Sequence, residues 1–416
     1  MTFSVTRTLA SVQATLLPLL DVVDGRVDDA TTPAWCSSRG WSDFLLGMSQ
    51  RDLERCEAEG LAVVASSLAG VPTSLAELAN DVRELSVLPA LGTRALAHES
   101  DEFRGVSWRK RQQLSSLLGA LGSLVGPARR IVDVGAGSGH FTRLSARHFD
   151  RESLGLERNA ERVARAHSRA QTEAHTGQHT AARFAVIDAV KDPLELHADD
   201  LAIGLHACGE LGDTLVRAVA ESGADLALVS CCLQKIGSPE RRALSNAAGG
   251  FALRKETLGL SNLTSQAIGV EASIEHTMLA REARYALRLL LRGRGLDIEP
   301  GAEMHGINRR RAHAGLADIA QRSLSLRGLP EASSAEISER EREATRHFQV
   351  MRRLSLPRNA LARAIELAVI LDRAARLEES GYSVRVATLF ERAVTPRNIS
   401  LFASRDGSRL PPLRHP

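Results

Sequence analysis

Cysteine is scarce in this sequence, and its scarcity excludes the small proteins that disulfide bonds hold together. There are five cysteines in 416 residues, and two of them, Cys231 and Cys232, are adjacent. Secreted domains that depend on disulfide bonds carry denser and more regularly spaced cysteines. The sequence therefore indicates a protein of the reducing cytoplasm, without a disulfide framework.

Long apolar runs are also lacking. Residues 1–20 are moderately apolar, but Arg7 and Gln13 interrupt them and no basic segment precedes them. A membrane-spanning helix needs about 20 predominantly apolar residues, and a secretory signal begins with a basic region. We therefore expect neither membrane insertion nor secretion.

Lysine is rare, whereas arginine is abundant. Lysine stands only at Lys110, Lys191, Lys235 and Lys255, so nearly all of the basic charge is arginine. The net charge of +3 is a weak indication of an anionic partner. With 44% hydrophobic and 25% charged residues, the composition is that of a globular protein long enough for two or three domains.

The middle of the chain alternates short apolar runs with helical segments. This alternation is typical of βαβ units, which form a parallel, doubly wound sheet. Ligands bind such sheets at the carboxyl ends of the strands. The expected strands are 131–135, 153–157, 184–188, 201–206 and 226–231, and the expected helices between them are 141–149, 160–171 and 211–222.

Helical patterns flank this core on both sides. Residues 1–104 predict helices with short connections, and residues 239–381 are mainly helical and rich in arginine. Two further strands, 384–390 and 399–403, follow. We expect an α/β fold, a Rossmann-like sheet with a helical N-terminal region and a large helical insertion before the last two strands. The predicted parts are 1–104, the core 105–238, the insertion 239–381 and a closing hairpin 382–408.

A glycine-rich loop follows the first expected strand. Residues 131–141 read I-V-D-V-G-A-G-S-G-H-F, with glycines at 135, 137 and 139. Glycine allows a sharp turn and close approach of the backbone to a ligand. The dinucleotide fingerprint needs a glycine at position 140, where His140 stands. Asp133 suits the ammonium group of a methionine moiety better than a pyrophosphate, which favours S-adenosylmethionine over a nicotinamide cofactor.

Acidic residues end the next two strands. Glu157 lies about 20 residues beyond the glycines, where a carboxylate accepts hydrogen bonds from ribose hydroxyls. Asp188 ends the third strand and can receive the exocyclic amine of adenine. The glycine loop, followed in order by Glu157 and Asp188, predicts a class I methyltransferase with S-adenosyl-L-methionine as cofactor. The predicted cofactor-binding residues are Asp133, Gly135, Ala136, Gly137, Ser138, Gly139, Glu157, Arg158, Asp188, Ala189 and His206.

The strand ends carry a resemblance to a known group. With the loop, the segments 206–209 (H-A-C-G) and 230–232 (S-C-C) resemble the methyltransferase-like group that includes the ribosomal RNA adenine dimethylase domain-containing protein. They are more distantly similar to the eukaryotic tRNA 2′-O-methyltransferases. The basic segment 106–111 and the hairpin 390–398 agree. The resemblance implies the Rossmann-like methyltransferase fold and an RNA substrate, although this sequence lacks the Cys/His zinc-finger segment of the tRNA enzymes.

Several chemistries stay open at the fourth and fifth strand ends. The Asn/Asp-Pro-Pro-aromatic motif of many amino-methylating enzymes is absent, which disfavours methylation of an adenine amine. His206 is a general-base candidate or a histidine that lines the cofactor. The cysteines are candidate nucleophiles, as in pyrimidine C5-methyltransferases, or small residues that fill space. The catalytic candidates are His206, Cys208, Cys231, Cys232 and Lys235, and we expect no metal because no C-x-x-C pair is present.

Basic residues outside the core suggest where a substrate would bind. In the insertion, arginines 281, 284, 288 and 292 share one face of a helix, where they could follow a phosphate backbone or form a solvated ion-pair face with Glu275 and Glu282. We expect methyl transfer to RNA. The alternatives are methylation of a protein or small metabolite, or a cofactor-binding module without turnover. The predicted substrate-binding residues are Arg109, Lys110, Arg281, Arg284, Arg288, Arg397 and Asn398.

Overall fold

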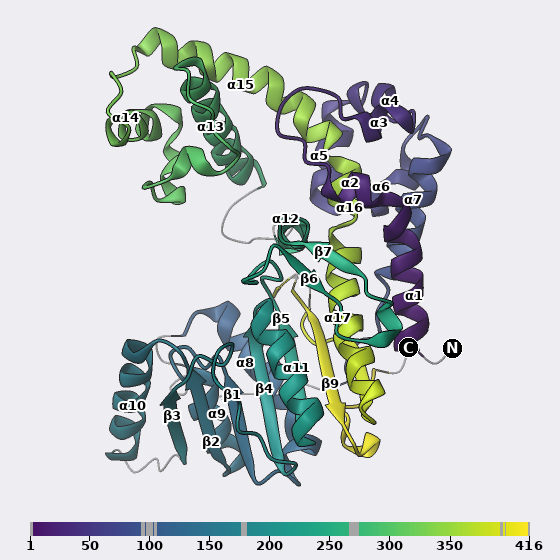
Figure 1. The fold of residues 1–416 in the computed structure, drawn as a ribbon, viewed down its shortest axis with the longest axis vertical. Helices are drawn as coiled ribbons and strands as arrows, with labels where there is room; N and C mark the ends of the chain where they lie inside the picture. The colour runs from purple at the N-terminus through teal and green to yellow at the C-terminus, as the bar shows by residue number, and fades with distance from the viewer. Residues whose placement is uncertain are drawn as a thin grey trace. The chain divides into compact units, whose positions relative to one another are not determined.

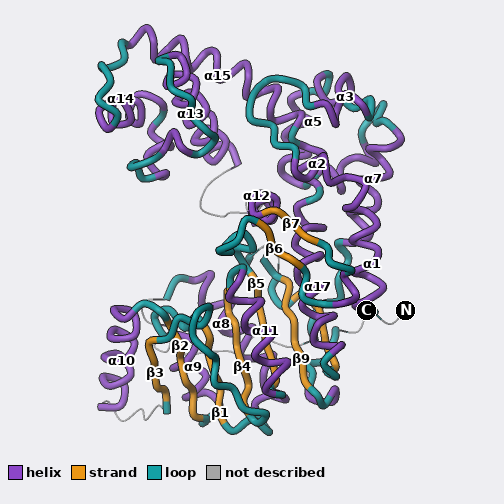
Figure 2. Tube along the Cα trace, viewed as in Figure 1, coloured by secondary structure: helices purple, strands orange, loops and turns teal. Residues whose placement is uncertain are grey.

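The computed structural model describes residues 3–92, 96, 103, 106–175, 181–265, 274–391, 394–395 and 397–414. The chain forms two compact units. The first comprises Met1–Pro18, Glu84–Ser265 and Ala362–Pro416, and the second comprises Leu19–Arg83 and Gln266–Leu361. Within the described residues every strand belongs to the first unit (Figures 1 and 2). The sequence analysis divides the chain into consecutive parts, whereas each of these units combines segments that are distant in the sequence. The boundaries at residues 104, 238 and 381 stay a prediction.

The first unit is built on a seven-stranded sheet of order β3-β2-β1-β4-β5-β9-β8. The first five strands along the chain are parallel, and β9 lies antiparallel between β5 and β8 (Figure 1). This confirms the predicted α/β fold, with its Rossmann-like sheet and a helical insertion before the last two strands. The strands are β1 Arg130–Val134, β2 Glu152–Glu157, β3 Ala182–Val186, β4 Asp200–Ala207, β5 Asp225–Ser230, β8 Ser383–Thr388 and β9 Ile399–Ser404.

Helices cover both faces of this sheet because alternate strand residues point to opposite sides. Leu201 and Ile203 of β4 join a core cluster with the apolar face of α8. The next residue, Gly204, faces Leu215 of α11 so closely that a methyl group would meet that side chain at 2.8 Å. The helices of this unit are α1 Val5–Leu16, α8 Trp108–Val125, α9 His140–Phe149, α10 Ala160–His175, α11 Glu210–Ser222, α12 Lys255–Leu258 and α17 Ala362–Glu379.

Part of the expected helical insertion belongs to the first unit and is not helical. Strands β6 (Glu240–Arg242) and β7 (Ala252–Arg254) form a small antiparallel sheet of their own. The expectation of a mainly helical segment from residue 239 missed them, because a strand of three residues is too short to show an alternating pattern. Pro396 of the expected closing turn lies outside the described residues.

The second unit is helical and joins segments that are distant in the sequence. Arg352 of α15 forms a bidentate ion pair with Glu57 of α5 at 2.6 and 2.9 Å. No helix among the residues that the structure describes is long and apolar enough to cross a membrane. The helices are α2 Leu20–Asp24, α3 Ala34–Ser38, α4 Ser42–Leu46, α5 Gln50–Glu59, α6 Leu61–Val64, α7 Thr73–Leu85, α13 Ile274–Gly293, α14 Leu316–Leu326, α15 Ser334–Leu354 and α16 Leu356–Ala360.

Candidate active site

The glycine loop connects β1 to α9 at the carboxyl edge of the sheet. Gly135, Gly137 and Gly139 all have positive φ, at 81°, 60° and 71°, a conformation that glycine adopts without steric cost. The N–H groups of Gly135 and Ala136 donate to the Leu156 carbonyl of β2 at 2.8 and 3.0 Å. The first turn of the loop is therefore held against the neighbouring strand.

Two of the glycines have different surroundings. A Cβ on Gly139 would lie 2.5 Å from the Phe184 ring, so this glycine is needed for packing. A Cβ on Gly137 would have no neighbour closer than 4.0 Å. The open side of the loop is thus at Gly137, where the backbone can approach a ligand directly.

Glu157 closes this loop from the end of β2. Its carboxylate accepts from the Gly137 N–H and from the Asn159 N–H, each at 3.0 Å, and it is 8% exposed. A carboxylate has about four acceptor positions, so two remain for other donors. The arrangement fits the two hydroxyl groups of a ribose.

Asp133 is the buried acid of the loop. Its Oδ2 accepts from the Thr142 hydroxyl at 2.6 Å. Burial raises the pKa of Asp133 to about 6, although the hydrogen bond from Thr142 and the charge of Lys110 oppose that shift. An ammonium group beside Asp133 would stabilise the carboxylate, and Lys110 of α8 already contributes one positive charge nearby.

The remaining predicted cofactor residues follow the strand ends. Asp188 comes two residues after β3 and is half-buried; its carboxylate accepts from the Val190 N–H at 3.3 Å and lies 3.7 Å from the Lys191 ammonium. Ala189 is buried, whereas Arg158 is exposed and Ser138 is half-buried in the loop. Arg158 follows β2 and Asp188 and Ala189 follow β3, at the carboxyl edge of the sheet, and their roles in cofactor binding stay predictions.

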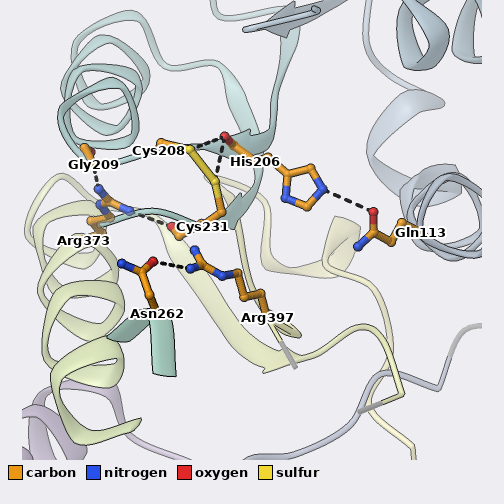
Figure 3. The surroundings of a disulfide bond; sticks show 9 residues. Gln113, His206, Cys208, Gly209, Cys231, Asn262, Arg373 and Arg397 are labelled. Atoms are coloured by element: carbon orange, nitrogen blue, oxygen red, sulfur yellow. Dashed lines mark hydrogen bonds between the residues drawn. A yellow bond between two sulfur atoms is a disulfide. The ribbon is translucent and has the colours of Figure 1, made fainter. Parts of the chain in front are cut away.

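His206 occupies an unusual backbone position at the end of β4. Its φ is +67°, which is rare outside glycine, and the pairing with β5 shifts register between Leu205 and Ala207. The ring Nε2 lies 3.2 Å from Gln113 Oε1 of α8 (Figure 3). With the Gln113 amide oriented as in the structure, its oxygen accepts from Nε2–H, and the assigned tautomer leaves the Nδ1 lone pair free. Burial, with the charges of Lys110 and Arg397, lowers the pKa of His206 to about 4, so the ring is neutral at pH 7.

The cysteines lie at the same edge, and two of them are bonded to each other. The structure records a disulfide between Cys208, after β4, and Cys231, after β5, with their Cα atoms 5.1 Å apart (Figure 3). The sequence favours small, space-filling cysteines over a disulfide; that expectation is wrong for this pair, which lies at the ends of the paired strands β4 and β5. Cys232 is free and half-buried. The side chain of Lys235 is exposed.

A buried arginine anchors both of these strand ends, and sequence reasoning missed it. Arg373 of α17 is 0% exposed and donates to the Gly209 carbonyl at 2.7 Å and the Ser230 hydroxyl at 2.6 Å. Asp213 balances its charge at 2.8 Å. The available signal was the Asp372-Arg373 pair directly after the apolar run 367–371.

Asp213 belongs to a buried ionic cluster of two arginines and two aspartates. Arg241 pairs with Asp213 at 2.9 Å and with Asp372 at 2.7 Å. Asp372 also accepts from the backbone N–H groups of Leu244 and Ser245. The cluster therefore joins α11, α17 and the β6–β7 segment beneath the cysteine end of the sheet.

Comparison with known families identifies the fold that carries this site. Residues 109–239 match the family model described as a methyltransferase domain. The chain carries a methyltransferase domain. With its seven-stranded order and glycine loop, the domain is a class I methyltransferase that uses S-adenosylmethionine. The donor supplies an electrophilic methyl group when it is bound.

Solved structures with similar folds include several methyltransferases. Geranyl diphosphate methyltransferase is 20% identical, with 36% of this chain and 59% of that one covered (TM-score 0.24). An O-methyltransferase of a Brevibacillus brevis multienzyme is 11% identical, with 35% and 52% covered (TM-score 0.24). Coclaurine N-methyltransferase is 12% identical, with 69% and 91% covered (TM-score 0.28). At these scores none of the likenesses bears on the substrate of this methyltransferase.

The arginines predicted to bind substrate from the insertion have internal partners. Arg288 is buried, donates to the Asp28 carbonyl at 3.1 Å and stacks over Tyr285. Arg284 pairs with the buried Glu303 at 3.2 Å, Arg281 is half-buried and Arg292 is exposed. Arg288 is therefore not free to bind a phosphate and contributes to the packing of the second unit, whereas substrate binding by Arg281 and Arg284 stays a prediction. The side chain of Glu275 lies outside the described residues.

The predicted substrate residues of the methyltransferase domain itself divide into two kinds. Arg109 is exposed at the start of α8, and Lys110, beside it, is half-buried near Asp133. Arg397 is half-buried and donates to the Asn262 side-chain oxygen (Figure 3). Asn398 is buried and hydrogen-bonded to Phe390 and Arg363, which gives it a structural role in the closing hairpin.

Proposed function

We propose that this methyltransferase transfers the methyl group of S-adenosylmethionine to RNA in the cytoplasm. The observation that carries the substrate class is at the start of α8. Trp108 is 60% exposed and is followed by the exposed Arg109 and by Lys110. Aromatic side chains with adjacent cations bind unstacked bases and their phosphates. The resemblance of the strand ends to the methyltransferase-like group named above supports the same class.

The proximity of this aromatic group to the donor site supports the proposal. Lys110 interacts electrostatically with both Asp133 and His206, so the start of α8 lies beside the cofactor loop and the end of β4. A base stacked on Trp108 would be near the carboxyl ends of β1 and β4. Among the exposed large hydrophobic side chains of the described residues, Trp108 is the aromatic one.

In this proposal each of the three acids and His206 has one task. Glu157 holds the ribose of the donor through its two remaining acceptor positions, Asp133 pairs with the ammonium group, and Asp188 accepts from the adenine amine. The neutral ring of His206 offers the Nδ1 lone pair to a donor group of the acceptor. These tasks orient donor and acceptor and need no metal ion.

The experiment is transfer of radiolabelled methyl groups to RNA from cells that lack the gene. We expect labelling by the wild type and a large loss in Trp108→Ala. Val87→Ala, which truncates a 76% exposed apolar side chain of the same unit, should label normally. Label in the protein or small-molecule fraction, with none in RNA, would favour the alternative substrates.

Salt dependence tests the phosphate contacts separately. Each contact to a single strand contributes a slope of roughly 0.7 in the logarithm of affinity against the logarithm of salt. Arg109→Ala should reduce the slope of RNA binding by about that amount and leave cofactor affinity unchanged. Filter binding over a salt series measures it, and a slope indifferent to Arg109 would contradict the assignment.

We also propose that the cysteines are not the nucleophile of this reaction. Cys208→Ser, Cys231→Ser and Cys232→Ser should keep most of the methyl transfer. A covalent adduct with a 5-fluoropyrimidine RNA that one of these variants abolishes would overturn this and indicate pyrimidine C5 methylation.

A further inference from the structure

Three cysteine sulfurs meet at one point of the sheet edge. The Sγ atoms of Cys208, Cys231 and Cys232 all lie within 4.8 Å of one another, and all three residues are half-buried. Among the residues that the structure describes, no other group of three His, Cys, Asp or Glu side chains is close enough to share a metal ion. The sequence argument against a metal relied on C-x-x-C spacing, which does not apply when neighbouring parallel strands bring the ligands together.

The cluster has two mutually exclusive chemical states. In one, Cys208 and Cys231 form the disulfide of Figure 3. A dithiol reductant transfers two electrons and two protons to this bond, is itself oxidised to a disulfide, and leaves three thiols. In the structure the Sγ atoms of Cys208 and Cys231 lie 3.1 and 3.3 Å from the His206 carbonyl, an acceptor that the two thiols would meet after reduction.

The sulfur spacing suits a soft divalent cation. Zinc binds thiolates at about 2.3 Å in tetrahedral geometry, which places neighbouring sulfurs about 3.8 Å apart. Rotation of the Cys208 and Cys231 side chains away from each other reaches that spacing, and Cys232 is already within 4.8 Å of both. Three thiolates leave a fourth position that water can occupy, since the cluster is only half-buried.

The surroundings hold the cysteines at a fixed place. Cys208 lies two residues before α11, next to its N-cap Gly209, and the helix dipole favours negative charge at that end. Arg373 donates to Gly209 and to Ser230, the residues that flank Cys208 and Cys231. Because Arg373 is itself held by Asp213, both strand ends are positioned before any metal binds.

We propose that the reduced protein binds a zinc-like, thiophilic divalent cation through Cys208, Cys231 and Cys232. The ion joins the ends of β4 and β5, and it replaces the disulfide as their link in a reducing compartment. Binding displaces the thiol protons into solvent. This site is separate from the methyl-transfer proposal, since no step of that reaction uses it.

The test uses the reduced, metal-free, full-length protein titrated with Co²⁺. Thiolate coordination gives a sulfur-to-cobalt charge-transfer absorption, which should saturate at one ion per chain. Loss of a ligand in Cys232→Ser should weaken binding by more than the roughly 10- to 100-fold that loss of an outer-shell partner costs. The matched control is the double variant Cys36→Ser and Cys56→Ser, which removes the two buried free cysteines of the second unit and should titrate like the wild type.

A second measurement needs no variant. With Zn²⁺ present, alkylation followed by peptide mass spectrometry should find Cys208, Cys231 and Cys232 protected in the wild type, and chelation should expose them. Air-oxidised protein should bind no Co²⁺. Absence of the charge-transfer band in reduced protein, its persistence in Cys232→Ser, or equal alkylation with and without Zn²⁺ would each overturn the proposal.

Discussion

The two halves of the active-site edge are built in different ways. The donor half, which comprises the glycine loop, Asp133 and Glu157, is held by hydrogen bonds between residues close in sequence. Thr142 donates to Asp133, nine residues away, and Gly137 donates to Glu157, twenty residues away. The acceptor half, which comprises the ends of β4 and β5, is held by hydrogen bonds between residues distant in sequence. Gln113 is 93 residues from its partner His206, and Arg373 is 164 residues from its partner Gly209. The donor half therefore depends on a continuous motif, and the acceptor half depends on completion of the whole unit.

The largest expected effect breaks the acceptor half. Arg373→Met leaves two buried aspartates opposite one arginine and removes the donors to Gly209 and Ser230. Removing one partner of a buried ion pair costs about 3–5 kcal/mol of unfolding free energy. The control Arg165→Ala removes an exposed ion pair with Glu161 in the same unit and should cost at most about 1 kcal/mol. Urea denaturation measures both, and similar losses in the two variants would contradict the prediction.

A second prediction separates folding from binding within the donor half. Gly139→Val places a side chain against Phe184 and should disrupt the packing of the sheet edge. Gly137→Val enters open space, so we expect a near-native circular dichroism spectrum and loss of S-adenosylmethionine binding. Positive φ adds a strain of about 1–3 kcal/mol at either position. Calorimetry with S-adenosylmethionine distinguishes them; normal binding by Gly137→Val would refute the open-loop interpretation.

The third prediction concerns the ribose. Glu157→Ala should weaken S-adenosylmethionine binding by about 1.5–3 kcal/mol, the value of hydrogen bonds to a charged group. Glu161→Ala, on the exposed face of α10, is the control and should bind normally. If NAD binds to the wild type and S-adenosylmethionine does not, the donor half has been misassigned.

The smallest effect is a pH dependence that arises in the donor half alone. Because burial raises the pKa of Asp133 to about 6, the apo protein takes up a proton there as the pH falls. The ammonium group binds the carboxylate, so the affinity for S-adenosylmethionine should fall below about pH 6, by at most roughly tenfold per pH unit. Asp133→Asn should bind weakly with no such dependence.

The same shift has a defined sign for stability. The pKa of Asp133 is higher in the folded protein than its ordinary value of 3.8, so its contribution to stability is present at low pH and is lost as the pH rises through about 6. Thermal unfolding of the apo protein between pH 4 and 7, with Asp133→Asn as reference, measures the contribution of Asp133 to stability.

The contrast between the halves also explains what the sequence revealed. All seven strands of the large sheet were predictable: the five parallel ones are short apolar runs between helices, and β8 and β9 are short apolar runs on either side of a turn. The loop residues were predictable as candidates because their spacing is local, and their roles in binding stay predictions. The contacts of Gln113 and Arg373 were not predictable, since each exists only once distant strands and helices have assembled. The nearness of Cys208 and Cys231 follows from the expected strand order, but the bond between them does not.

The arginine row of α13 shows a different limit. Periodicity places Arg281, Arg284 and Arg288 on one face, but it does not say what that face contacts. In the middle of the helix Ala283, Tyr285, Leu287 and Arg288 are all buried. A helix of this kind packs on several sides, so a polar row can be internal when acidic and carbonyl groups meet it.

The discontinuity of the first unit has a consequence for synthesis on the ribosome. Strand β5 is complete at Ser230, but its neighbour β9 begins only at Ile399. At about 5–20 residues per second, the nascent chain holds an apolar, unpaired β5 edge for on the order of ten seconds or more. Such an edge pairs readily with other extended segments, so chaperone dependence and aggregation during translation should be concentrated in this interval. Ribosome-bound fragments that end before and after residue 404 would show the difference.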